Sequence, residues 1–389
     1  MYNVDGVSVF LETERGGAIV GWRDCDISDL CQLQRGFDLT EATRKQGTVP
    51  VYSSSGVSYF HCEAKLEPPA VITGRKGQLG RVFFVEEPSW PHDTTLWVKD
   101  FKGNDPQFVS IFLGAFRLER FDAATSVPTL NRNNLVGHAI RIPPLPEQRA
   151  IAAALGDVDA LLEGLTRLIA KKRDLKQAAM QQLLTGQTRL PGFHGEWEES
   201  TVGREFEVAL GKMLDAEKNV GIPKPYIGNR SVQWGRIEIT ELESVRLTRS
   251  DMERYRLAKG DLLVCEGGEV GRAAIWNEPI EECYYQKALH RLRPLRGMNS
   301  HFMAAILEFW ADRGVLENYV TQTSIAHLPR EKFIEVPILV PAIPEQTAIA
   351  TVLSDMDTEL AALEARRDKT CALKQAMMQE LLTGKTRLV

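Results

Sequence analysis

The feature that most constrains this chain is a long internal repeat. A stretch that begins with Pro146-Glu147-Gln148 and ends with Thr188-Arg189-Leu190 recurs without a gap 198 residues later, at 344–388. Of the 48 positions from 143 to 190, 26 are identical in the second copy. The chain has 389 residues, which leaves room for two or three domains. We therefore expect two equivalent segments that alternate with two other regions.

Each copy of the repeat predicts one long helix. Apolar residues in the first copy fall in steps of four and three at 151, 155, 158, 162, 165 and 169, which is the spacing of a coiled-coil seam. The seam is expected to continue with a shifted phase through Leu175, Ala179 and Leu183, and in the second copy through 373, 377 and 381. A proline before each Glu-Gln pair suits a helix start, and Gly186 and Gly384 suit a helix end. We expect two helices of about 35–40 residues that pack antiparallel within one chain; a dimer coil or a purely structural hairpin is the alternative.

The regions outside the helices predict two related globular domains of mixed α and β structure. Short apolar, β-rich runs at 70–73, 82–85 and 261–264 are bounded by glycine and proline, as strands are. A tryptophan precedes a glycine by 14 residues in both regions, and a G-x-x-G-R turn follows a strand-like run in both, at 77–81 and 268–272. The predicted fold class is α/β (α+β), with two globules and two long helices. The predicted segments are 1–142 (first globule), 143–190 (central helix), 191–340 (second globule) and 341–389 (C-terminal helix).

Composition excludes several classes of protein. No apolar run approaches the roughly 18–20 residues that a membrane helix needs. The N-terminal Met1–Asp5 lacks the basic start of a signal peptide. Six cysteines without a CxxC pair suggest neither a zinc ribbon nor a disulfide framework, so we expect a reducing, cytoplasmic location. The formal net charge of −5 is unlike that of a generic nucleic-acid binder, so any such function must rest on local patches.

Motifs for catalysis are missing from the sequence. There is no G-x-G-x-x-G, no complete P-loop, no methyltransferase tetrapeptide (Asn or Asp, Pro, Pro, aromatic) and no histidine pair with metal-ligand spacing. Gly384-Lys385-Thr386 resembles only the tail of a P-loop and falls at a predicted helix end. We therefore expect no catalytic residue and no metal site in this chain.

Polar and basic residues near the two glycine turns are the candidates for contact with DNA. Arginine and lysine pair with phosphates or guanine edges, and glutamine pairs with adenine. The candidates are Ser54, Tyr59, Arg75, Lys76, Arg81, Arg249, Arg254, Arg256, Arg272, Gln286, Lys287, Arg291 and Arg293. The competing interpretation is a solvated face on which acidic neighbours answer the arginines. For Arg81 and Arg272, phosphate contact is favoured over base reading, because a position next to a turn has little freedom to reach a base. A structural pair with a nearby acid such as Glu86 or Glu269 is the alternative to any DNA contact.

The repeat motifs resemble those of a known family. The P-x-x-P-E-Q start and the L-L-T-G-x-T-R-L end, occurring twice around two divergent globules, resemble the specificity (S) subunit of type I restriction–modification systems. The resemblance implies that each globule is a target recognition domain for one half of a split DNA sequence. It also implies that the helices form an antiparallel coiled coil that spaces the domains and docks methyltransferase subunits. The implied spacer and docking residues are Glu147, Gln148, Leu162, Glu345, Gln346 and Leu360.

The resemblance also implies the partners of the chain. These are double-stranded DNA, two methyltransferase subunits and, in a complete system, restriction/translocase subunits, with no membrane. S-adenosylmethionine, Mg²⁺ and ATP would bind only to partner subunits, and this chain would do no chemistry itself. Two other classes stay open: a scaffold that binds only proteins, and an enzyme with an unrecognised site.

Overall fold

The computed structural model describes residues 19–122, 126–215, 217, 219–322 and 326–388. The N-terminal residues Met1–Asp5 therefore lie outside the described part. The chain divides into two compact units, one made of Met1–Arg167 with Glu364–Val389 and the other of Leu168–Leu363. In the described part, no helix is both long and apolar enough to cross a membrane.

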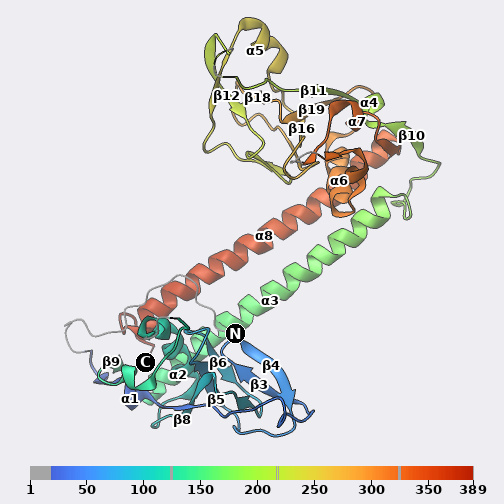
Figure 1. Ribbon diagram of the computed structural model, residues 1–389. Coiled ribbons are helices and arrows are strands. Elements are labelled where there is room, and N and C mark those ends of the chain that lie inside the picture. Colours follow the sequence, from blue (N-terminus) through green and yellow to red (C-terminus); the bar gives the residue numbers. More distant parts are fainter. Residues whose placement is uncertain (1–18, 123–125, 216, 218, 323–325, 389) are drawn as a thin grey trace. The chain divides into compact units, whose positions relative to one another are not determined.

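The globular part of the first unit contains two main sheets and a short strand pair (Figure 1). An antiparallel sheet has the order β2 (Gln32–Arg35), β8 (Thr95–Asp100), β5 (Ala70–Gly74) and β6 (Val82–Val85). The second sheet has the order β4 (Gly56–His61), β3 (Val49–Ser53) and β7 (Trp90–Pro91), and the pair is β1 (Arg23–Asp26) with β9 (Ala139–Ile142). The short helices are α1 (Ile27–Leu30), α2 (Pro106–Ala115), η1 (Leu118–Phe121) and η2 (Arg132–Leu135).

Helix α2 shows how the sequence determines local structure in this unit. Asp105 caps the helix by accepting a hydrogen bond from the backbone N–H of Phe108, and Pro106 occupies the first turn, where its missing N–H costs nothing. Phe108 and Phe112 are almost fully buried in the main core of the unit. The same core takes up Ile151 from the central long helix and Leu381 from the C-terminal one. The globule and its two helix segments are thus one packed body.

The second unit repeats this plan. Its four-stranded antiparallel sheet has the order β11 (Phe206–Leu210), β19 (Leu289–Pro294), β16 (Leu262–Cys265) and β17 (Ala273–Ile275), and its three-stranded sheet is β15 (Ser244–Leu247), β12 (Ile222–Ile227) and β18 (Tyr284–Tyr285). Short pairs are β10 (Glu198–Thr201) with β22 (Pro337–Val340), β13 (Val232–Gln233) with β14 (Arg236–Ile237), and β20 (Thr321–Gln322) with β21 (Ala326–His327). The remaining helices are α4 (Val202–Glu205), α5 (Arg249–Tyr255), α6 (Ser300–Asp312), η3 (Val315–Tyr319) and α7 (Arg330–Phe333).

The two repeats form the helices α3 (Leu145–Leu184) and α8 (Ile343–Leu382), each of 40 residues. Gly186 and Gly384 follow the helix ends with φ of +71°, a left-handed conformation that glycine adopts without strain. The helices predicted between Pro146 and Gly186 and between Pro344 and Gly384 are therefore confirmed to within two residues at each end. The strands predicted at 70–73, 82–85 and 261–264 are confirmed to within one residue. The division of the chain at 142, 190 and 340 remains a prediction.

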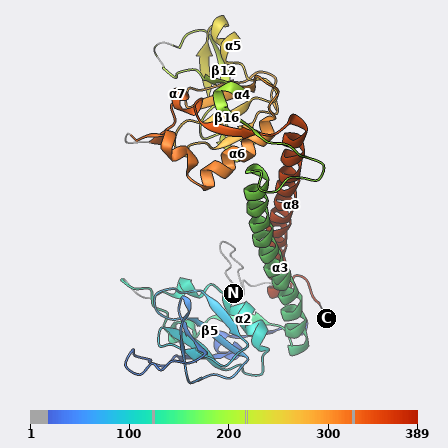
Figure 2. The ribbon, with the colours of Figure 1, turned by 90° about the vertical axis from the view of Figure 1, so that its right-hand side faces the viewer.

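The helix segments run antiparallel within each unit. In the second unit Lys172 pairs with Glu359 at 2.7 Å and Lys176 with Asp357 at 2.6 Å. Residue numbers therefore decrease along α8 where they increase along the facing part of α3. In the first unit Lys374 pairs with Asp159 at 2.5 Å. Figure 2 shows the two segments side by side in the second unit.

The predicted seam needs one correction. Most residues of the regular spacing in the first copy are buried, with Leu155 and Leu165 at 0% and 4% exposure, while Val158 and Leu162 are partly buried. Leu175 and Leu373, at equivalent positions of the two copies, are instead 47% and 54% exposed. At the phase shift the residue that faces the partner helix is Lys176 instead of Leu175. Lys176 is buried and forms ion pairs with Glu308 on α6 and Asp357 on α8.

Candidate nucleic-acid interface

In each unit a glycine turn connects the last two strands of the four-stranded sheet, β5 to β6 in the first and β16 to β17 in the second. The turn 74–81 follows β5, and the turn 265–272 follows β16. Gly77 and Gly80 have φ of +91° and +81°, and Gly268 and Gly271 have φ of +74° and +86°. These conformations favour glycine, so the backbone geometry explains the recurring G-x-x-G spacing.

The main chain around both turns is held by the same hydrogen bonds. The backbone N–H of Arg75 donates to Thr94 at 2.8 Å, and that of Glu266 donates to Ala288 at 3.0 Å. The carbonyl of Arg75 accepts a hydrogen bond from the backbone N–H of Leu130, and the carbonyl of Glu266 accepts one from Leu328. Two more backbone hydrogen bonds correspond between the units, written here from N–H donor to carbonyl acceptor: His92→Tyr52 with Gln286→Ile227, and Phe37→Pro91 with Lys212→Tyr285. We call this shared arrangement of the turn, the loop 91–95 or 285–289 and the strand end the recognition frame.

One small polar residue lies beneath each turn. Ser54 is buried, and its hydroxyl would lie 3.3 Å from a Cβ placed on Gly77. Asn229 occupies the corresponding place in the second unit, where its Nδ2 donates to the carbonyl of Gly267 at 3.1 Å. Ser54 is thus buried beneath its turn, and its contact with DNA stays a prediction. Asn229 was not among the residues predicted from the sequence.

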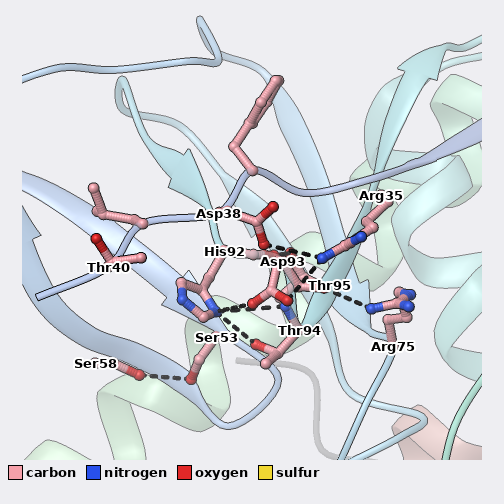
Figure 3. Close-up of polar contacts among 12 residues, drawn as sticks. Arg35, Asp38, Thr40, Ser53, Ser58, Arg75, His92, Asp93, Thr94 and Thr95 are labelled. Atoms are coloured by element: carbon pink, nitrogen blue, oxygen red, sulfur yellow. Dashed lines mark hydrogen bonds and ion pairs between the residues drawn. The ribbon is translucent and has the colours of Figure 1, made fainter. Parts of the chain in front are cut away.

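The side chains of the first frame form a polar cluster (Figure 3). The guanidinium of Arg35 contacts both Asp38 and Asp93 at 3.0 Å, and Nδ1 of His92 lies 2.9 Å from the carboxylate of Asp93. Arg75 donates through Nη1 to the backbone carbonyl of Asp93 at 2.9 Å. One carboxylate thus orders two basic side chains, and the main chain of the same residue orders a third.

The second frame carries different groups at the same positions. Glu266 replaces Arg75, Gln286 replaces His92, and Lys287 replaces Asp93. Glu266 is buried and contacts Nε2 of His327 at 3.0 Å. Burial raises the pKa of the Glu266 carboxyl, and the nearby His327 and Lys287 oppose that effect. A common backbone therefore presents two chemically different surfaces.

The arginines that follow the two turns differ in their surroundings. Arg81 is partly exposed and donates to the carbonyl of Ser55 at 3.1 Å. The side chain of Arg272 is only 15% exposed and contacts both Glu269 and the carbonyl of Asn229 at 3.0 Å. The ion pair with Glu269, which was the alternative for Arg272, is therefore present, and phosphate contact by either arginine stays a prediction.

The other predicted residues divide into exposed and buried groups. Lys76 and Lys287 are exposed near the turns, Tyr59 lies under the guanidinium of Arg44, and Arg249, Arg254 and Arg256 are exposed on or beside α5. Arg291 is 4% exposed, and Arg293 bonds to the buried carboxylate of Asp261 at 2.6 and 2.9 Å. That bond raises the pKa of the Arg293 guanidinium. Both residues lie in β19, where Arg291 is buried and the side chain of Arg293 is 37% exposed. Contact of either residue with DNA stays a prediction.

The predicted docking residues at the helix starts are buried within their own unit. Glu147 and Gln148 are 0% and 2% exposed, and Glu345 and Gln346 are each 1% exposed. Gln148 accepts from the backbone N–H of Asp105 at 2.9 Å, as Gln346 does from Asn299 at 2.8 Å. Leu360 is buried at 9%, and Leu162 is partly buried. The glutamine side chains thus join each helix start to its globule. The docking role of all six residues stays a prediction.

Several functional candidates were missed because they are brought together only by folding. Arg35, His92 and Asp93 belong to no motif and meet across separate strands. Arg189 and Arg387 did have a signal, since both stand in the repeated T-R-L end.

Comparison with known proteins agrees with this arrangement. The family model of the type I restriction modification DNA specificity domain matches residues 19–171 and 194–370. The chain therefore belongs to this family, whose members provide DNA sequence recognition within type I restriction–modification complexes. A curated relative, the specificity subunit of the type I restriction enzyme MjaVIII from Methanocaldococcus jannaschii, is 21% identical over 304 residues, or 72% of this chain and 70% of the relative.

Solved structures show the same fold. The S subunit of a type I restriction–modification system from M. genitalium matches with a TM-score of 0.65 and 17% identity, over 95% of this chain and 98% of that chain. A chain from a structure on complex assembly and conformational transition of the type I R-M system matches with a TM-score of 0.57 and 16% identity, over 95% and 100% of the two chains. The predicted family and the predicted α+β class are thus confirmed.

Proposed function

We propose that each recognition frame reads one half of a split double-stranded DNA target. The observation that carries this proposal is the pairing of one backbone arrangement with two sets of side chains. Arg75 and Asp93 stand where Glu266 and Lys287 stand in the other unit, so the charges are exchanged on a constant main chain. Different donors and acceptors at the same place select different base pairs, because each base pair has its own pattern in the major groove.

The long helices supply the spacer in this proposal. In each unit the helix segments pack antiparallel and are fixed to the globule by a buried Glu-Gln pair. A stiff connection makes binding of the second half-site intramolecular, so affinity is gained only at the matching separation. The helices thereby convert two short sequences into one long target.

Exposed leucines on the helices are the docking surface that we assign to the methyltransferase subunits. Leu168 and Leu175 lie seven residues apart on α3 in the second unit, on one face of the helix, and are 39% and 47% exposed. Leu373 in the first unit is the equivalent of Leu175 and is 54% exposed. Because the same position is exposed in both units, the proposal includes two methyltransferase subunits, each contacting one unit.

The chain is proposed to do no chemistry itself. S-adenosylmethionine, Mg²⁺ and ATP would bind to partner subunits, which include restriction/translocase subunits in a complete system. The proposed location of the complex is the cytoplasm. The net charge of −5 supports a complex in which partner subunits make part of the phosphate contacts, because these contacts depend on lysine and arginine side chains that the partners can supply. The isolated chain is then expected to bind DNA weakly and with a shallow salt dependence.

An exchange of one recognition region tests the function. Residues 1–142 are replaced by the equivalent region of a relative, the complex is reconstituted with methyltransferase subunits, and the methylated motif is sequenced. We expect one half of the motif to change and the other half to stay. A change in both halves would contradict independent reading, and the absence of sequence-specific DNA retention by the wild-type complex would favour a scaffold that binds only proteins.

The isolated chain is the second part of this test. Incubated with DNA and the methyl donor, it should transfer no methyl groups, whereas the reconstituted complex should methylate adenine at a split motif. Transfer by the isolated chain, free of contaminating subunit, would instead support an enzyme with an unrecognised site.

A further inference from the structure

We propose that Arg75 and Gln286 are the base-reading side chains of the two frames, Arg75 for a guanine in one half-site and Gln286 for an adenine in the other. This inference rests on the proposed function and deepens it by assigning the specificity-determining residues. Each frame offers two side-chain positions beside the glycine turn, 75 and 92 in the first unit and 266 and 286 in the second. In each frame one of these side chains is held by a charged neighbour, His92 through Nδ1 by Asp93 and Glu266 by His327. The other side chain keeps most of its hydrogen-bonding groups unused.

In the first frame, position 92 is the engaged one. Nδ1 of His92 lies 2.9 Å from the carboxylate of Asp93 and 3.2 Å from the hydroxyl of Thr94. Arg75, in contrast, uses one N–H of its guanidinium, on Nη1, for the carbonyl of Asp93. A guanidinium has five N–H donors in a planar fork, so donors remain for a ligand.

The position of Arg75 favours reading over general attraction. Its backbone N–H and C=O are both bonded within the frame, and the bond to Asp93 directs the side chain, as Figure 3 shows. A directed fork loses little entropy on binding and matches the O6 and N7 acceptors of guanine. Lys76 beside it is exposed but has no fork, and Arg81 is held to the carbonyl of Ser55.

In the second frame the roles are reversed. Glu266, at the position of Arg75, is buried against His327 and cannot turn outward without losing that contact. Gln286, at the position of His92, is partly exposed, and no group in the described part of the chain bonds to its side-chain amide. Its backbone is fixed by bonds to Ile227 and Leu289.

The amide of Gln286 has the chemistry for adenine. A glutamine side chain offers one donor group and one acceptor, which match the N7 and N6 positions of adenine. Gly228 leaves room for this amide, because a Cβ at that position would lie 3.2 Å from its Nε2. A fixed backbone and a free amide therefore make Gln286 the reading group of this frame.

Conservative substitutions test the assignment in the complex reconstituted with methyltransferase subunits. R75K keeps the charge but removes the fork, and Q286E keeps the shape but removes the donors. Methylation is measured on DNAs that carry each single-base change in the wild-type motif. We expect R75K to reduce discrimination at one G·C pair of one half-site by about ten- to a hundredfold, and Q286E to do the same at one A·T pair of the other half-site.

Control variants distinguish a failure of this inference from a failure of the proposed function. K99A removes an exposed charge from β8, away from the turn, and should leave the motif unchanged. R75Q and Q286A serve as second variants if a melting curve shows that R75K or Q286E does not fold. An unchanged motif in the folded Arg75 or Gln286 variants, or a uniform loss of affinity for all sequences, would overturn the assignment while the proposed function stands. If the wild-type complex has no split motif, the proposed function itself fails.

Discussion

Glu147 and Arg387 lie 240 residues apart in the chain and form a two-pronged ion pair, with Nε–Oε1 and Nη2–Oε2 distances of 2.5 and 2.7 Å. Arg189 and Glu345 make the same pair with the roles of the two helices exchanged, at 2.5 Å for both bonds. A tryptophan lies near each arginine, and Nε1 of Trp22 also donates to Glu147 at 2.9 Å. The bond to the glutamate raises the pKa of each guanidinium. The repeat thus closes each unit with an identical contact.

The two partners of this pair should not be equivalent in mutagenesis. Glu147 is fully buried, whereas the side chain of Arg387 is 30% exposed. R387A leaves a buried, unpaired carboxylate, while E147Q leaves an arginine that water can reach. We expect R387A to lower the melting temperature by several degrees and E147Q to lower it less. R167A, at an exposed position, is the control, and a larger effect of E147Q would contradict the argument.

The corrected helix seam predicts a contrast between two leucines of the second unit. Leu353 is 2% exposed and Leu175 is 47% exposed. L353A should cost about 2–4 kcal/mol of unfolding free energy because it opens a cavity, while L175A should change it by about 0.5 kcal/mol or less. Urea denaturation followed by circular dichroism measures both. Equal costs would mean that Leu175 packs in the seam after all.

The two turn arginines should separate stability from binding. R272A removes bonds to Glu269 and to the carbonyl of Asn229, so we expect a loss of about 1–3 kcal/mol in unfolding free energy. R81A removes one bond at a partly exposed site and should cost about 0.5 kcal/mol or less. Thermal melts of both variants test this difference. A stable R272A complex with weakened binding to all DNA sequences would instead support phosphate contact by Arg272.

Buried His290 should make the second unit sensitive to acid. Its Nε2 lies 2.9 Å from the carbonyl of Leu328, and burial lowers the pKa of its imidazole to about 4. The folded state therefore keeps this histidine neutral, while the unfolded chain takes up a proton near pH 6.5. Stability from this group is complete above pH 6.5 and is lost as the pH falls toward 4, by up to about 3 kcal/mol.

A difference measurement isolates the contribution of His290. The unfolding free energies of the wild type and H290Q are compared at several pH values between 7 and 4. The wild type should lose more stability than H290Q over this interval. Parallel curves for the two proteins would show that His290 does not titrate as described.

Local patterns in the sequence were enough to predict the helices and several strands. The steps of four and three around Leu155 identify a helix face without any knowledge of the partner helix, and Gly186 marks its end. The glycine turns were also predictable, because the left-handed conformation at Gly77 and Gly268 restricts the choice of residue. These features depend on neighbours a few residues away.

The missed features depend on residues far apart in the chain. Arg35 meets Asp93 only after β2 and β8 have paired, and nothing near either residue in the sequence indicates the contact. The burial of Arg291 was not predicted because an arginine in a strand is expected at a solvated face, whereas four successive residues of β19 are buried. Leu175 was misplaced because a seam that shifts phase can continue on either of two faces.

The closing pair between Glu147 and Arg387 also sets an order of events during synthesis. The first unit takes its final helix segment from residues 364–388, which leave the ribosome only after the whole second unit has been made. The second unit is continuous in the chain and can assemble as it emerges. The globule that is translated first is therefore completed last. Until residues 364–388 arrive, the apolar surface of this globule that packs against Leu381 and Leu382 faces the solvent. The order of translation, rather than the stability of either unit, therefore determines which unit completes its folding last.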